Sequence, residues 1–274
     1  MALHAAKAAL AATLAALVAA PALAQDSTPA DFARAVASLS ERIGTIETGP
    51  EIATTDQAAN AADLAVIERA LGAFGTPAFP VDGFATFESV CEAVNRLSVR
   101  HGLDGVSAMA RPPGSPPPTP AELQVLTAKV VALQSRNAAR YPDAVTVLAG
   151  GGMRCMVKHF PAITAFLADL PEAELTPARL KGADGMRRGG STALLGFMIA
   201  LREPATTPAN KLRITAYVAE VATPLAAVLT PPMRADLGAK LDQLPPTQDA
   251  AALASTELLK AALAYTTCEG LCRY

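Results

Sequence analysis

The sequence predicts an all-α protein in which roughly eight to ten helices form an irregular bundle. Three observations lead to this fold class: a repeated helix-start signal, apolar residues at helical spacing, and the lack of sustained apolar–polar alternation of the kind that predicts strands. An α-solenoid is the alternative fold, although a search for repeats of about 30–45 residues finds no consistent register.

Five of the Thr-Pro pairs in the chain supply the helix-start signal. Threonine caps the first turn with its side-chain oxygen, and proline at the first helical position loses no hydrogen bond. Asp31 and Glu122, each at the third helical position, add a capping box to two of the pairs. The pairs are Thr28-Pro29, Thr119-Pro120, Thr176-Pro177, Thr207-Pro208 and Thr230-Pro231.

Apolar residues recur every three or four positions along the chain. This spacing predicts helices near residues 32–43, 64–74, 90–97 and 123–133, the last of which ends near Tyr141-Pro142. Further helices are predicted at 192–203, at 211–229 with a kink at Pro224, at 234–244 and at 249–265. The nearly continuous apolar stretch 192–201 is too short to cross a membrane, so we expect it to be a buried helix.

The first residues have the three parts of a cleavable signal peptide. His4 and Lys7 give a weakly positive start, residues 8–20 form an unbroken apolar run, and a small-x-small site ends at Ala24. We therefore expect residues 1–24 to be removed on export to the periplasm or the exterior. The mature chain is expected to be soluble, with no integral membrane segment.

Six prolines lie within residues 110–120, which must therefore be extended. This segment predicts a linker between an N-terminal helical unit (25–109) and a C-terminal helical unit (121–274). The other interpretation is a surface loop within one continuous domain, 25–274. The sequence leaves both open.

Charge and composition exclude some classes of partner. The net charge is −2, charged residues are spread evenly, aromatic residues make up 4% of the chain, and tryptophan is absent. These features give no basis for binding nucleic acid. No complete cofactor motif is present, so no cofactor is predicted, and an envelope protein is a candidate partner.

All four cysteines, Cys91, Cys155, Cys268 and Cys272, remain after signal cleavage. An even number of cysteines in an exported chain predicts disulfides. We favour Cys91–Cys155 with Cys268–Cys272, because Gly270 would let the short C-terminal loop close on itself. The two crossed arrangements stay open.

Arg100-His101-Gly102, preceded by residues 97–99 (LSV), is similar to the signature of the histidine phosphatase superfamily. The resemblance implies an α/β sheet whose first strand ends at this motif, a histidine that becomes phosphorylated, and an arginine that holds the phosphate. This sequence departs from the family pattern at Asp104, where the signature has a second arginine. It also departs at His159, which is not followed by an acid.

The same three residues also fit the end of a helix. Arg100 and His101 would then face the negative end of the helix dipole, and Gly102 would be the residue just after the helix. This interpretation accounts for every residue of the motif and is the one we prefer.

A second candidate site begins at the glycine run 150–152, which is typical of a break before a helix and could expose N–H groups to an anion. Cys155 and His159 would share one face of that helix. Together with Cys268 and Cys272 they could form a zinc site, and Met153 and Met156 could offer soft ligands to Cu(I). We prefer disulfides, because an exported chain meets oxidising conditions.

A third candidate is the segment 187–192 (RRGGST), in which two arginines precede an expected helix start. Such an arrangement could grip a phosphate or a carboxylate. The preferred interpretation is two solvated arginines and a glycine turn ahead of a Ser191 or Thr192 cap.

No complete catalytic constellation is present, so we expect a non-catalytic binding or structural protein of the cell envelope that acts through a helical surface or groove. Two alternatives remain. One is a phosphate-handling hydrolase using Arg100 and His101. The other is a periplasmic metal-binding protein using Cys155, His159, Cys268 and Cys272.

Overall fold

The computed structural model describes residues 28–43, 57–80, 84–103, 116–265, 267–268 and 270–274. Within these ranges the protein has nine α-helices, two 3-10 helices and no β-strand, so the all-α prediction is confirmed. The elements are α2 (Pro29–Ile43), α3 (Gln57–Ala73), α4 (Phe84–Leu103), α5 (Pro120–Arg140), α6 (Pro142–Ala168), η2 (Glu172–Glu174), α7 (Pro177–Ala200), α8 (Pro208–Val228), α9 (Pro231–Asp242), α10 (Ala250–Tyr265) and η3 (Gly270–Arg273).

The Thr-Pro pairs begin five of these helices: α2, α5, α7, α8 and α9. At α5 the capping box is complete, because Thr119 accepts from the Glu122 amide and Glu122 accepts from the Thr119 amide, at 3.3 and 2.7 Å. Thr28 and Asp31 make the same reciprocal pair at α2. These starts follow from a few adjacent residues, which is why the sequence could place them.

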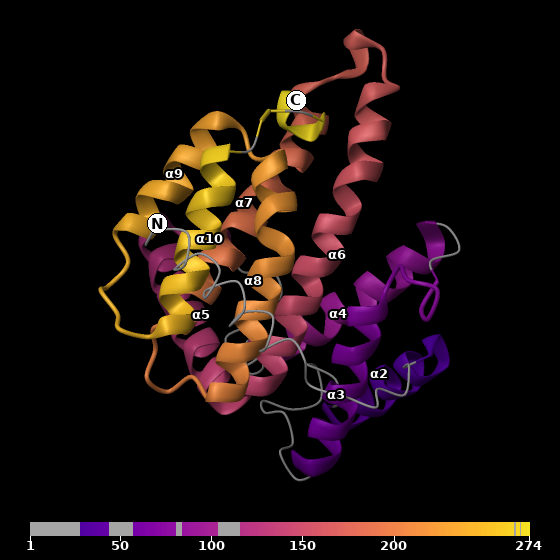
Figure 1. Ribbon diagram of the computed structural model, residues 1–274, viewed down its shortest axis with the longest axis vertical. Helices are drawn as coiled ribbons and strands as arrows, with labels where there is room; N and C mark the ends of the chain where they lie inside the picture. The colour runs from indigo at the N-terminus through magenta and orange to yellow at the C-terminus, as the bar shows by residue number, and fades with distance from the viewer. Residues whose placement is uncertain (1–27, 44–56, 81–83, 104–115, 266, 269) are drawn as a thin grey trace, which may run out of the picture.

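One hydrophobic core, the N-terminal cluster, packs α2, α3 and α4 against the first half of α6 (Figure 1). Its centre consists of Leu39, Ile67, Leu71, Val94 and Leu148, each at most 1% exposed. Burial of this apolar surface stabilises the fold.

In a second core, the C-terminal cluster, the second half of α6 packs against α7, α8 and η3, and α9 and α10 pack on α7 and α8. Leu194, Met198, Val218, Val221 and Leu225 are fully buried at its centre. Since α6 contributes to both cores, it is the element that the two clusters share. Residues 104–115 lie outside the described ranges, so the division at 110–120 stays a prediction.

Both disulfides have the pairing that the sequence favoured. Cys91 on α4 bonds Cys155 on α6 across a Cα–Cα distance of 5.6 Å. Cys268 bonds Cys272 in the short segment after α10, at 5.2 Å, with Gly270 at a φ of +55° between them. Gly270 adopts this left-handed conformation without the steric cost that a side chain would add.

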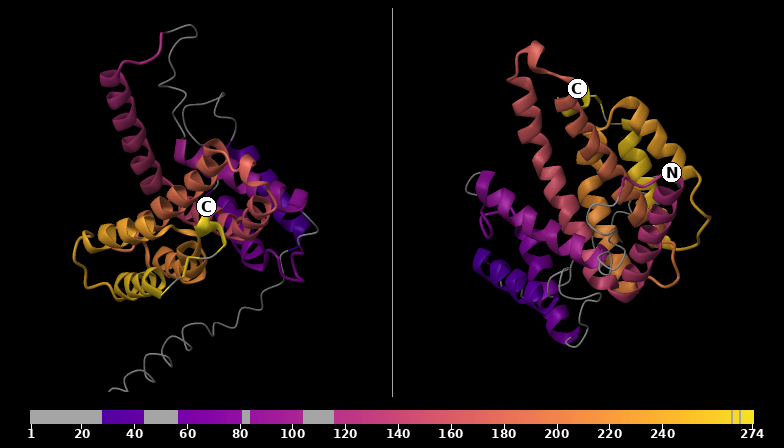
Figure 2. Two further views of the ribbon diagram at one scale, coloured as in Figure 1. Left: turned by 90° about the horizontal axis from the view of Figure 1, so that it is seen from above. Right: turned by 180° about the vertical axis from the view of Figure 1, so that it is seen from behind.

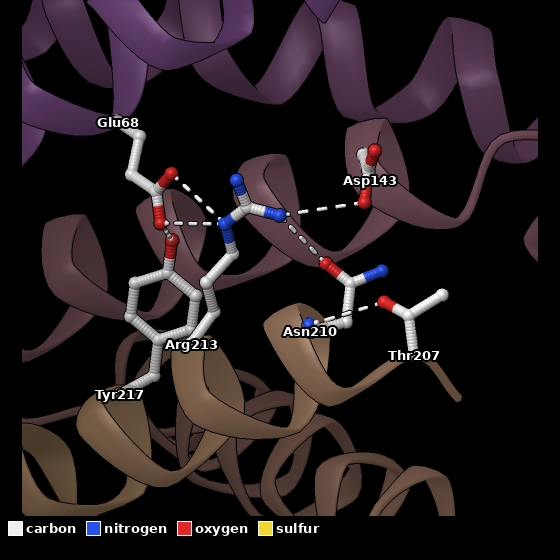
Figure 3. A network of polar contacts seen from close by, with 6 residues as sticks. All are labelled: Glu68, Asp143, Thr207, Asn210, Arg213 and Tyr217. Carbon is white, nitrogen blue, oxygen red and sulfur yellow. Dashed lines mark hydrogen bonds and ion pairs between the residues drawn. The ribbon is translucent and has the colours of Figure 1, made fainter.

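A polar network connects α3 to α8 (Figure 3). The Glu68 carboxylate accepts from Arg213 Nε at 3.0 and 3.1 Å and from the Tyr217 hydroxyl at 3.1 Å. Arg213 also donates to Asp143 and Asn210. Burial, followed by the charge of Glu68, raises the pKa of Tyr217 above its usual value, so the hydroxyl stays protonated and donates. The network links one helix from each cluster.

The signal-peptide prediction concerns residues 1–24, which lie outside the described ranges. In the part of the chain that the structure describes, no helix is long and apolar enough to span a bilayer.

Candidate functional site

A groove of about 580 Å³ lies between α7 and α9. Four residues of α7 at helical spacing form one wall, and residues of α9 form the other. The lining consists of Arg188, Ser191, Thr192 and Leu195 from α7, with Pro232, Met233, Asp236, Leu237 and Lys240 from α9.

The α7 wall comes from the segment 187–192, which the sequence placed just before a helix. That prediction was wrong, because the helix begins ten residues before the segment, at Pro177 after Thr176, and includes the whole segment. Gly190 is helical and packs closely: a Cβ there would lie 2.6 Å from Met156 and 2.8 Å from Leu225. The glycine therefore allows close helix packing and makes no turn.

Arg187 and Arg188 are adjacent in sequence but have separate roles. Arg187 is fully buried, and its guanidinium donates to the carbonyl of Val228 at 2.8 Å and to that of Leu271. It also pairs with Asp184 at 2.7 Å. Arg187 is thus a buried structural residue, and the prediction of two solvated arginines was wrong for it.

Arg188 is exposed and lines the groove. No described residue forms a hydrogen bond or an ion pair with its guanidinium. Across the groove, Lys240 pairs with Asp236 at 2.7 Å, and both side chains are more than half exposed. Asp236 offsets one of the two cations, so the groove carries one net positive charge.

The groove also has an apolar floor and hydroxyl groups. Leu237 is 2% exposed, and Leu195 and Met233 are half-buried beside it. Ser191 Oγ donates to the Arg187 carbonyl at 2.9 Å, and the hydroxyl oxygen can still accept a bond from a ligand. A cation and hydroxyls above an apolar floor suit an anion that carries a short apolar chain.

Arg100 and His101 each contact a different backbone carbonyl oxygen. His101 is 3% exposed, and its Nδ1 lies 2.9 Å from the Leu97 carbonyl one turn earlier in α4. Arg100 donates to the Ser40 carbonyl at 3.3 Å. Both residues are in the last turn of α4, as the helix-end interpretation predicts, and no sheet precedes them in the described residues. That interpretation was wrong for Gly102, which lies inside the helix because α4 continues to Leu103. The α/β fold implied by the phosphatase resemblance is therefore absent from these residues.

The metal-site alternative needed free thiolates from Cys155, Cys268 and Cys272. Every one of these sulfurs is in a disulfide. Burial lowers the pKa of His159, an effect that the charge of Glu88 partly opposes. Within the described residues, no three metal-binding side chains gather at one place.

The glycine run 150–152 does not begin a helix. It lies inside α6, so its amides are not the exposed N–H groups that an anion would need. A Cβ on Gly150 would lie 2.2 Å from the Tyr217 ring, and one on Gly151 would lie 2.5 Å from Leu71. These two glycines let α6 approach α8 and α3.

Sequence reasoning missed the α9 wall of the groove. Met233, Leu237 and Lys240 recur at helical spacing, which identifies a helix face but not the helix opposite. Comparisons with family models, with curated proteins and with solved structures find no match for this chain.

Proposed function

We propose that this chain is an exported, non-catalytic binding protein of the cell envelope and that the α7–α9 groove binds a small amphiphilic anion. The single observation that carries the proposal is Arg188, a cation without a described partner beside an apolar floor. The two disulfides are consistent with an oxidising compartment.

The ligand class follows from the lining. A phosphate or carboxylate would accept charge-assisted hydrogen bonds from Arg188, and a bond from the Thr192 hydroxyl. The chain attached to it would cover Leu195, Met233 and Leu237 and remove their apolar surface from water. The groove volume of about 580 Å³ falls in the range typical of small-molecule sites.

Isothermal titration calorimetry with hexyl phosphate, hexanoate and uncharged hexanol tests the proposal. Both anions should bind more tightly than hexanol. Arg188→Gln should weaken anion binding by about tenfold and leave hexanol binding unchanged, because it removes the charge but keeps a polar side chain of moderate length.

Lys181→Gln is the matched control, since Lys181 is an exposed cation two turns earlier on α7 that does not line the groove. Equal binding of anions and hexanol, or equal loss in the Lys181 variant, would reject the site. Hydrolysis of the alkyl phosphate would reject the non-catalytic part of the proposal.

Export has a separate test. Mass spectrometry of the protein recovered from the cell envelope or the medium should show a mature chain that begins at Gln25. An intact N-terminus at Met1 would contradict it.

A further inference from the structure

Helix α5 packs against the rest of the molecule along one narrow face. Leu133 and Asn137 are buried, and Leu126 and Val130 are half-buried. These four residues are spaced by four, three and four, so they form a single stripe. Figure 2 shows α5 standing away from the other helices over much of its length.

The opposite face of α5 is apolar and exposed. Val125 and Val131 are each 55% exposed, and the alanines beside them are exposed as well. The face repeats every seven residues, which is the period that keeps one side of a helix against a partner helix. Its central positions are Ala121, Val125, Ala128, Ala132, Ser135 and Ala139.

Charged residues flank this face in an ordered way. Glu122, Lys129 and Arg136 follow one edge of the face at seven-residue steps, with the acid at the start of the helix and the bases after it. Glu122 also accepts from Thr119, and Arg136 Nε donates to Asn137 at 3.2 Å. A carboxylate has further acceptor sites and a guanidinium has five donors, so both can make another contact.

We propose that α5 pairs with α5 of a second copy of this chain, antiparallel and about a two-fold axis near residue 130. Antiparallel pairing puts Glu122 beside Arg136 of the other copy, and the two-fold axis makes this contact twice. It also brings Lys129 beside Lys129 of the other copy, so two ion pairs are opposed by one like-charge contact. It places Ala121 opposite Ala139, and Ala128 opposite Ala132, so that small residues let the two backbones approach closely. In a parallel pair the charged edges of the two helices would lie on opposite sides of the interface, so Glu122 and Arg136 would not meet.

Site-directed disulfide formation tests this geometry on the full mature chain. No described cysteine is free, so one introduced cysteine supplies a single thiol. Val131→Cys lies next to the axis and should form a covalent dimer. Ala121→Cys should not do so alone, but should cross-link when mixed with Ala139→Cys. Self-linking of Ala121→Cys, or no cross-link in any combination, would overturn the proposal.

Charge exchange gives a second test, by sedimentation equilibrium. Arg136→Glu should raise the dimer Kd by about tenfold, because two ion pairs become two repulsions. Adding Glu122→Arg should restore the affinity, with circular dichroism confirming that α5 still forms without its capping box. An unmodified chain that is monomeric at the highest concentration tested, or a double variant as weak as the single one, would contradict the pairing. If the chain associates through another face, all these variants will have the same dimer Kd as the unmodified chain.

Discussion

The two hydrophobic clusters are fastened by different means. In the N-terminal cluster, the Cys91–Cys155 bond connects helices that are separated by 64 residues in sequence. In the C-terminal cluster, the disulfide closes only a short loop, and the buried Arg187 guanidinium holds that loop by the Leu271 carbonyl. Segments that are distant in sequence are thus held together by a covalent bond in the N-terminal cluster and by the hydrogen bonds of a buried cation in the C-terminal cluster.

The largest expected effect concerns the long-range disulfide. Replacing both Cys91 and Cys155 by alanine should lower the free energy of unfolding by about 4 kcal/mol, since the bond restricts a long loop in the unfolded chain. Replacing Cys268 and Cys272 should cost about 2 kcal/mol, because the loop is short. Urea unfolding measures both free energies. A larger loss of stability in the Cys268/Cys272 variant would show that the long-range disulfide is not the more stabilising of the two.

Arg187→Met should cost about 3 kcal/mol, because the carbonyls of Val228 and Leu271 lose their buried donors. The neighbouring variant Arg188→Met is the control and should change stability by less than about 0.5 kcal/mol, since Arg188 is exposed. Similar urea midpoints for the two variants would show that the buried guanidinium does not stabilise the C-terminal cluster.

Gly150→Ala tests the contact between α6, which both clusters share, and α8. The added methyl group would overlap the Tyr217 ring, so a loss of about 2 kcal/mol is expected. Gly152→Ala has no neighbour within 4 Å and should stabilise the helix by up to about 1 kcal/mol. A shift of the Tm in the same direction for both variants would contradict the conclusion that Gly150, and not Gly152, is in close contact with α8.

The smallest effect is a pH dependence at His159. Its folded-state pKa is below the ordinary value of 6.5, so the neutral ring is favoured in the folded protein. The resulting stability is present above pH 6.5 and is lost as the pH falls through the lower folded-state pKa. His159→Gln should reduce the difference between urea midpoints measured at about pH 7.5 and about pH 5.5. An unchanged difference would assign the pH dependence to other groups.

Much of the fold could be predicted because its signals are local. Thr119 and Glu122 lie within one helical turn, and their reciprocal bonds need no tertiary contact. The candidate site was harder to predict from the sequence, because its two walls come from different helices. The segment 187–192 was a candidate anion site, but the preferred interpretation was solvated arginines and a glycine turn before a helix.

The sequence by itself determined the fold class and the helix starts at five Thr-Pro pairs, because capping and helical spacing act between residues close in the chain. It favoured the observed cysteine pairing but left the crossed arrangements open, since Cys91 and Cys155 are 64 residues apart. Only the tertiary structure decided that Arg187 is buried while Arg188 lines a groove, and that the glycine runs lie inside helices. The reason is that these outcomes depend on which side chains the facing helices present, such as Tyr217 against Gly150 or Leu225 against Gly190.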